Sequence, residues 1–93
     1  MALVAIKQLR NVKAGAVAAG SFSGNPKTAA VTFAAAMPST SYAISIQCVS
    51  TGDTFAPVVT SKAVGGFTIN LGTNNLGNLT EVLWIVTPYS NVA

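Results

Sequence analysis

Apolar and polar residues alternate along most of this chain, and a period of two predicts β-strands almost throughout. The alternation is clearest in residues 42–49 and 67–71, where every second side chain is aromatic, aliphatic or Cys. Residues 81–87 are apolar at both sets of alternate positions, which is typical of a central strand covered on two sides, one of them by a neighbouring subunit if the sheet is antiparallel. The expected strands span residues 2–9, 28–34, 42–49, 55–61, 67–71 and 81–87.

Turn residues separate these segments, with Gly and Asn concentrated in residues 72–78 and a Gly65-Gly66 pair before the fifth segment. Residues 12–22 are rich in Ala and Gly, and we interpret them as an irregular strand or extended arm, because internal glycines disfavour a helix. About six to seven short strands predict an all-β fold, a small antiparallel β-sandwich. We expect residues 1–26 to form a strand or arm for attachment and subunit contacts, and residues 27–93 to form the sandwich domain.

The aromatic residues divide into expected core anchors and expected surface contacts. Phe33, Phe67 and Trp84 fall on the apolar faces of predicted strands and should anchor the core. Tyr42 and Tyr89 stand at strand ends, so they are the candidates for exposed aromatic contacts. The single cysteine, Cys48, lies in an apolar run, where a thiol behaves as a small hydrophobic group.

The composition adds an unusual shortage of charge. Only 8% of the residues are charged, against about a quarter in a typical globular domain. This favours a surface that meets other protein in an assembly, although a neutral, hydroxyl-rich surface on an ordinary soluble domain is the alternative. Three of the five cations, Lys7, Arg10 and Lys13, lie near the N-terminus without interleaved aromatic residues, which argues against a nucleic-acid partner.

The inventory of reactive side chains is too small for most enzymes. There is no His, and Asp53 and Glu81 are the only acidic side chains, so a Ser-His-Asp triad and a Cys-His pair are excluded. We therefore expect no catalytic residues, no metal site and no cofactor. The N-terminus lacks the pattern of a signal peptide, and no apolar run approaches the ~18 residues that span a bilayer. We expect synthesis in the cytoplasm and no membrane insertion.

The order of several short motifs resembles the H-type lectin-like domain of bacteriophage tail fibres and related virion proteins. The resemblance covers about residues 27–88, and Val86 departs from the small residue usual at its position. It depends on Val31-Thr32-Phe33, Met37-Pro38, Tyr42-Ala43-Ile44-Ser45-Ile46, Gly66-Phe67-Thr68-Ile69 and Val82-Leu83-Trp84-Ile85-Val86.

This resemblance implies a six-stranded antiparallel sandwich that assembles as a homotrimer or as paired trimers. Animal lectins of the family bind N-acetylgalactosamine between subunits, but their charged sugar contacts have no match in this chain. A sugar site here would come from the turn at residues 51–54 and the loop at residues 72–78. The candidate ligand-binding residues are Asp53, Asn74, Asn75 and Tyr89.

Three interpretations of function follow. The first is a non-enzymatic virion structural protein of the tail or baseplate, with a host-receptor glycan as a further partner. The second is a capsid decoration protein that stabilises the head lattice, and the third is a free carbohydrate-binding lectin. In the first two, the partners are other copies of the chain and other virion proteins, and the protein is made in the bacterial host cytoplasm and incorporated into the virion.

Overall fold

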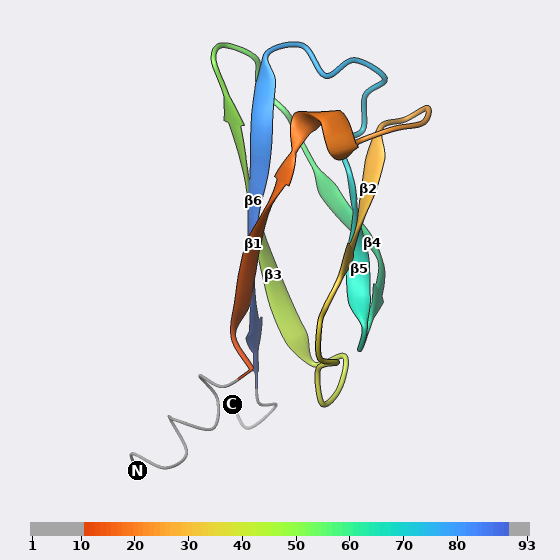
Figure 1. The fold of residues 1–93 in the computed structure, drawn as a ribbon, viewed down its shortest axis with the longest axis vertical. Helices are drawn as coiled ribbons and strands as arrows, with labels where there is room; N and C mark the ends of the chain where they lie inside the picture. Colours follow the sequence, from red (N-terminus) through yellow and green to blue (C-terminus); the bar gives the residue numbers. More distant parts are fainter. Residues whose placement is uncertain (1–10, 90–93) are drawn as a thin grey trace.

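Two three-stranded antiparallel sheets form a sandwich-like, all-β fold in the computed structural model, which describes residues 11–89 (Figure 1). The only helical segment in this described part is a 3-10 turn, Ala19–Ser21. The first sheet has the order β1-β6-β3 and the second β2-β5-β4. The strands are β1 (Lys13–Ala18), β2 (Thr28–Thr32), β3 (Tyr42–Ser50), β4 (Val58–Ala63), β5 (Gly66–Asn70) and β6 (Leu79–Pro88).

The expected all-β sandwich is confirmed, and five of the expected strands correspond to β2 to β6 within about three residues at either end. The strand expected at residues 2–9 lies outside the described residues. The expected central position of β6 is confirmed, since it pairs with β1 on one side and β3 on the other. Strand β4 begins only after Pro57, at a sheet edge, because Pro has no N–H to give to a ladder.

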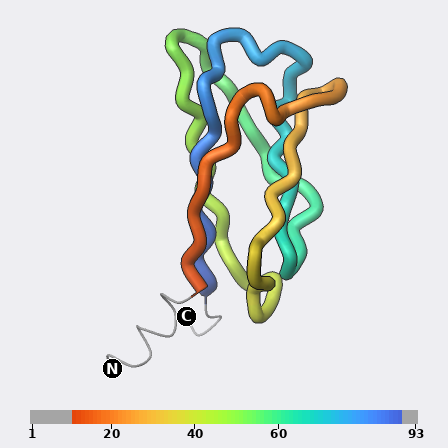
Figure 2. The backbone as a smooth tube through the Cα atoms, in the orientation of Figure 1, coloured from red at the N-terminus to blue at the C-terminus, as the bar shows by residue number. Residues whose placement is uncertain are grey.

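The Ala- and Gly-rich stretch belongs to the sandwich. Strand β1 pairs with β6 without a break, from Lys13 opposite Val86 to Ala18 opposite Glu81. The chain then crosses to the second sheet through the 3-10 turn (Figure 2). The Phe22 side chain, which follows this turn, belongs to the core. The remainder of the expected arm, residues 1–10, lies outside the described part.

An aromatic cluster fills one part of the space between the sheets. Phe33 and Phe67 are buried, with ring centroids 5.9 Å apart, and Trp84 lies 5.9 Å from Phe33 and 5.6 Å from Phe67. Trp84 is only partly buried, and its indole lies over Gly15 of β1, where any Cβ would overlap the ring. The three expected anchors therefore pack together from three strand regions, within or beside the core.

Tyr42 was expected on the surface, and this expectation is wrong. Its side chain is 1% exposed and its hydroxyl donates to the carbonyl of Ala63 at 2.6 Å and to that of Gly66 at 3.2 Å. The hairpin between β4 and β5 covers this end of β3, so a position at a strand end does not bring exposure. Burial raises the pKa of the Tyr42 hydroxyl.

The outer face of the first sheet carries two apolar side chains at its centre and is uncovered among the described residues. Alternation along β6 places Val82, Trp84 and Val86 toward the core, and Leu83 and Ile85 on the opposite face. Ile85 is 43% exposed. Within the described part of the chain, β6 is therefore covered on one side only. No helix there has the length and apolar character to cross a membrane.

Candidate functional site

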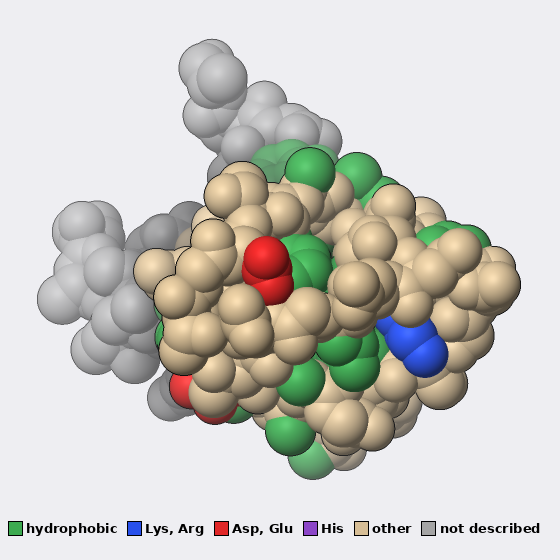
Figure 3. Space-filling model, turned by 90° about the horizontal axis from the view of Figure 1, so that it is seen from above, with side chains coloured by type: hydrophobic (Ala, Val, Ile, Leu, Met, Phe, Trp, Pro, Cys, Tyr) green, Lys and Arg blue, Asp and Glu red, His purple; other side chains and the backbone are tan. Residues whose placement is uncertain are grey.

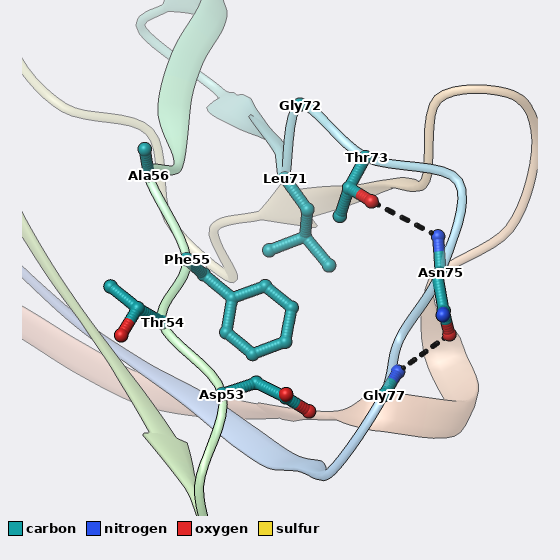
Figure 4. Close-up of a pocket in the computed structure, with 9 residues that line it drawn as sticks. All are labelled: Asp53, Thr54, Phe55, Ala56, Leu71, Gly72, Thr73, Asn75 and Gly77. Atoms are coloured by element: carbon teal, nitrogen blue, oxygen red, sulfur yellow. Dashed lines mark hydrogen bonds between the residues drawn. The ribbon is translucent and has the colours of Figure 1, made fainter.

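Two loops meet at one end of the sandwich and enclose a pocket of about 380 Å³. One loop, residues 51–57, connects β3 to β4, and the other, residues 71–78, connects β5 to β6 (Figure 1). The lining residues come from these two loops alone: Asp53, Thr54, Phe55, Ala56, Leu71, Gly72, Thr73, Asn75 and Gly77 (Figure 4).

Short polar side chains fold each loop locally. In the first loop the Ser50 hydroxyl oxygen accepts from the Asp53 N–H at 2.9 Å. In the second, the side-chain oxygen of Asn70 accepts from the Gly72 N–H at 2.7 Å, and that of Asn75 accepts from the Gly77 N–H at 2.8 Å. Asn and Ser favour such turns because their side chains reach backbone groups two or three residues ahead. The pocket wall is therefore specified mainly by local sequence.

Asp53 joins the two loops. Its Oδ2 accepts from the Asn78 N–H at 2.6 Å, and the Asn78 carbonyl accepts from the Thr51 N–H at 3.3 Å. Gly77 beside it has φ +53°, and a Cβ at this position would overlap the Asp53 carboxylate. The close approach and the left-handed backbone both require glycine here.

An apolar floor lies between these polar walls. Figure 4 shows the Phe55 ring between the Asp53 carboxylate and the Leu71 side chain. Leu71 is buried and Phe55 is half-buried, so the ring offers part of its surface to the pocket. Seen from this end of the sandwich in Figure 3, an acidic side chain stands beside apolar side chains near the centre, and a second acidic side chain and one basic side chain are visible farther out.

The structure brings together two of the four candidate ligand residues. Asp53 and Asn75 both line the pocket, from different loops. Asn74 is exposed on the same loop as Asn75 but does not line the pocket. Tyr89 lies at the opposite end of β6; it is 49% exposed and its N–H donates to the Ser41 carbonyl at 3.0 Å. The pocket therefore does not include Tyr89.

Sequence reasoning missed Phe55 as a site residue. Residues 55–61 are expected to be a strand throughout, which assigns the Phe55 ring to packing alone. In the structure the ring packs against the core and also lines the pocket. Pro57 was the available signal, because it delays the strand to Val58 and leaves Phe55 in the loop.

No family model, curated protein or solved structure matches this chain. The chemistry of the pocket is therefore argued from its own groups. Asp53 is the one acidic side chain in the lining, and within residues 11–89 no three His, Cys, Asp or Glu side chains converge as metal ligands would.

The lining groups suit a neutral, polyhydroxylated ligand. A carboxylate accepts hydrogen bonds only, an amide both donates and accepts, and the hydroxyls of Thr54 and Thr73 do either. A sugar ring carries hydroxyl donors around its edge and an apolar C–H face, which matches polar walls and a Phe55 floor. The Asp53 carboxylate disfavours an anionic ligand, because like charges repel.

Proposed function

We propose that this chain is a non-enzymatic structural protein of a bacteriophage virion, associated with the tail or baseplate, that binds a neutral host-cell glycan. In this proposal it is an H-type lectin-like homotrimer, made in the bacterial cytoplasm and incorporated into the particle. The sequence resemblance to virion domains supports the phage context. Only 8% of the residues are charged, and this supports a surface that is in contact with other protein subunits in an assembly.

One observation carries the glycan-binding part of the proposal. The pocket combines a partly buried aromatic ring, Phe55, with the Asp53 carboxylate and the Asn75 amide, in a hollow of about 380 Å³. This volume lies within the range of known small-ligand sites. The pocket also sits at the end of the sandwich, on loops, which is where binding residues are commonly found.

A second candidate function, capsid decoration, is favoured by the outer face of the β1-β6-β3 sheet. Leu83 and Ile85 project from this face between two strands of small or neutral residues. By register, Ala14 and Ala16 flank them on β1, and Ser45 and Gln47 flank them on β3. Exposed apolar surface of this kind is typical of a protein interaction site.

The test of the first function is sugar binding by the purified chain. We expect neutral mono- and disaccharides at millimolar concentration to shift the NMR signals of the 51–57 and 71–78 loops. Phe55→Ala should weaken this binding about tenfold, which corresponds to roughly 1.4 kcal/mol of lost contact. A uronic acid of the same ring size should bind more weakly than its neutral sugar.

Tyr89→Ala is the matched control, because it removes an exposed aromatic ring at the far end of β6. It should leave sugar binding unchanged. If Tyr89→Ala abolishes sugar binding and Phe55→Ala does not, the sugar binds at the Tyr89 end of the sandwich and the pocket is not the site. Absence of binding to any sugar would remove the receptor role, and locating the chain on the particle by labelling would then decide between tail and capsid.

A further inference from the structure

Strand β3 presents an unprotected sheet edge. It is an edge strand of the β1-β6-β3 sheet, nine residues long, and it contains no charged residue and no Pro. Its pairing with β6 is regular from Tyr42 to Val49, with a shift only at Ser50. In an antiparallel pair, every second residue of an edge strand turns its N–H and C=O away from its partner. Long, flat and uncharged edges of this kind readily accept another strand.

The other edges of the described sandwich differ from β3. Strand β4 has a register shift between Thr60 and Ala63, where Ser61 takes φ +55° and a lysine, Lys62, is exposed. A bulge and a lysine are the usual protections of an edge against pairing. Strands β1 and β2 have only six and five residues. Among the described strands, β3 is the longest edge. The Lys62 ammonium donates to the Tyr42 carbonyl at 3.0 Å, at the first residue of β3, and the edge lacks such protection over Ala43–Val49.

The core side of β3 is also incompletely covered. Ile44, Ile46 and Cys48 point to the core and contact it, yet all three are only partly buried. Residues at the centre of a sheet would be covered by neighbours on both sides. A further strand beside β3 would bury these three side chains, provided that it carries apolar residues on the same face.

We propose that residues 2–9 of a second copy of this chain pair antiparallel with β3 and extend the first sheet to four strands. This segment, Ala-Leu-Val-Ala-Ile-Lys-Gln-Leu, has eight residues, so it matches the length of β3. In one alternation, Val4 faces the core beside Cys48, Ile6 beside Ile46 and the polar Gln8 beside Ile44. Lys7 then faces outward, together with Leu3 and Leu9. The inference sharpens the proposed assembly of the chain with itself and does not depend on the sugar pocket.

The chain's own N-terminal segment is too short to make this contact over its full length. Lys13 of β1 and Ile44 of β3 both pair with Val86, on opposite sides of β6. A strand beyond β3 would lie three strand spacings from β1, about 14 Å. The four Cα steps from Leu9 to Lys13 also span at most about 14 Å, which leaves no residue to reverse the chain direction. A second copy has no such limit.

Disulfide trapping tests the proposal, because Cys48 is the chain's single cysteine and lies on the core side of β3. Directly paired strand residues bring their Cα atoms within disulfide range. Val4→Cys or Ile6→Cys, oxidised with diamide, should give disulfide-linked dimers and trimers on a non-reducing gel, because in a homotrimer each chain would give its segment to the next. Ala5→Cys is the matched control, since its side chain faces the opposite side of the strand, and it should remain largely unlinked.

Each other result overturns the proposal. A disulfide that forms within one chain, seen as loss of both thiols without a dimer band, would assign the edge to the chain's own segment. Linkage through Ala5→Cys alone would place Ala5, and not Val4 and Ile6, on the core side beside Cys48, and the proposed pairing would be wrong. If no position links, or if the dimer persists after Cys48→Ser, β3 is not the acceptor. Deletion of residues 1–9 keeps β1 intact and should convert the oligomer to folded monomer in sedimentation velocity.

Discussion

The two ends of the sandwich are built in opposite ways. At the end where β3 begins, Tyr42 is buried and its hydroxyl donates to two carbonyls of the other sheet. At the end where β3 finishes, the chain forms two loops held by short polar side chains around an open pocket. The first end ties the sheets together, and the second leaves room for a ligand. Substitutions should therefore separate stability from binding according to the end they touch.

The largest effect should come from Tyr42→Ala. The ring is 1% exposed, packs edge-on against Phe33 at 5.9 Å, and lies beneath the Lys62 ammonium at 5.0 Å. Removing a buried aromatic side chain costs about 3–5 kcal/mol, because the cavity collapses only partly. Denaturant unfolding followed by Trp84 fluorescence should show this loss in the free energy of unfolding.

Tyr89→Ala is the control for this loss, since it removes the same side chain from an exposed position. It should change the free energy of unfolding by less than about 0.5 kcal/mol. Equal effects of the two substitutions would mean that the Tyr42 end does not hold the sheets together.

A smaller effect isolates the Tyr42 hydroxyl. Tyr42→Phe keeps the ring and leaves the carbonyls of Ala63 and Gly66 without this donor. We expect a loss of about 1–3 kcal/mol, mainly because the buried Gly66 carbonyl loses a donor and is not rehydrated, whereas Ala63 is exposed and its carbonyl can bind water.

Titration of the Tyr42 hydroxyl also predicts that the free energy of unfolding depends on pH. Burial raises the pKa of Tyr42 above its ordinary value of 10.0, so the folded state holds the proton more tightly than the unfolded state. The stability linked to this proton is complete below pH 10 and is lost as the pH rises through the folded-state pKa. Unfolding curves between pH 8 and 11 should show a steeper decline for the native chain than for Tyr42→Phe. Parallel curves would reject Tyr42 as the cause.

The sequence pattern predicted the strands better than the ends. Alternation located β3 and correctly placed Tyr42 on the same face as Ile44, and this face proved to be the core side. The wrong expectation for Tyr42 came from its position at a strand end, which carries no information about what a distant hairpin covers. The pocket was partly foreseen, because Asp53 and Asn75 lie in polar turns. The apolar floor of the pocket was not foreseen, because the place of Phe55 depends on where β4 starts after Pro57.

The effect of Gly77→Ala, at the pocket end, should fall on sugar binding and on the loop contact more than on the core. Gly77 has φ +53°, where an L-residue costs about 1–2 kcal/mol, and the added Cβ would overlap the Asp53 carboxylate. The Asp53 side chain must then move, which breaks its hydrogen bond from the Asn78 N–H and opens the contact between the loops. We expect a large NMR shift of the Asn78 amide and loss of sugar binding, with the core signals unchanged.

Gly65→Ala is the matched control for the pocket, because nothing lies within 4 Å of a Cβ at that position. It adds the same methyl group at the Tyr42 end of the sandwich and should leave both the Asn78 amide and sugar binding unchanged. If Gly77→Ala instead unfolds the chain as Tyr42→Ala does, the two loops belong to the cooperative core. The contrast between the ends would then be false, since the pocket would be as essential to the fold as the Tyr42 contacts. If only the pocket signals respond, the ends are energetically separate, and the loops are free to vary in sequence without loss of the sandwich.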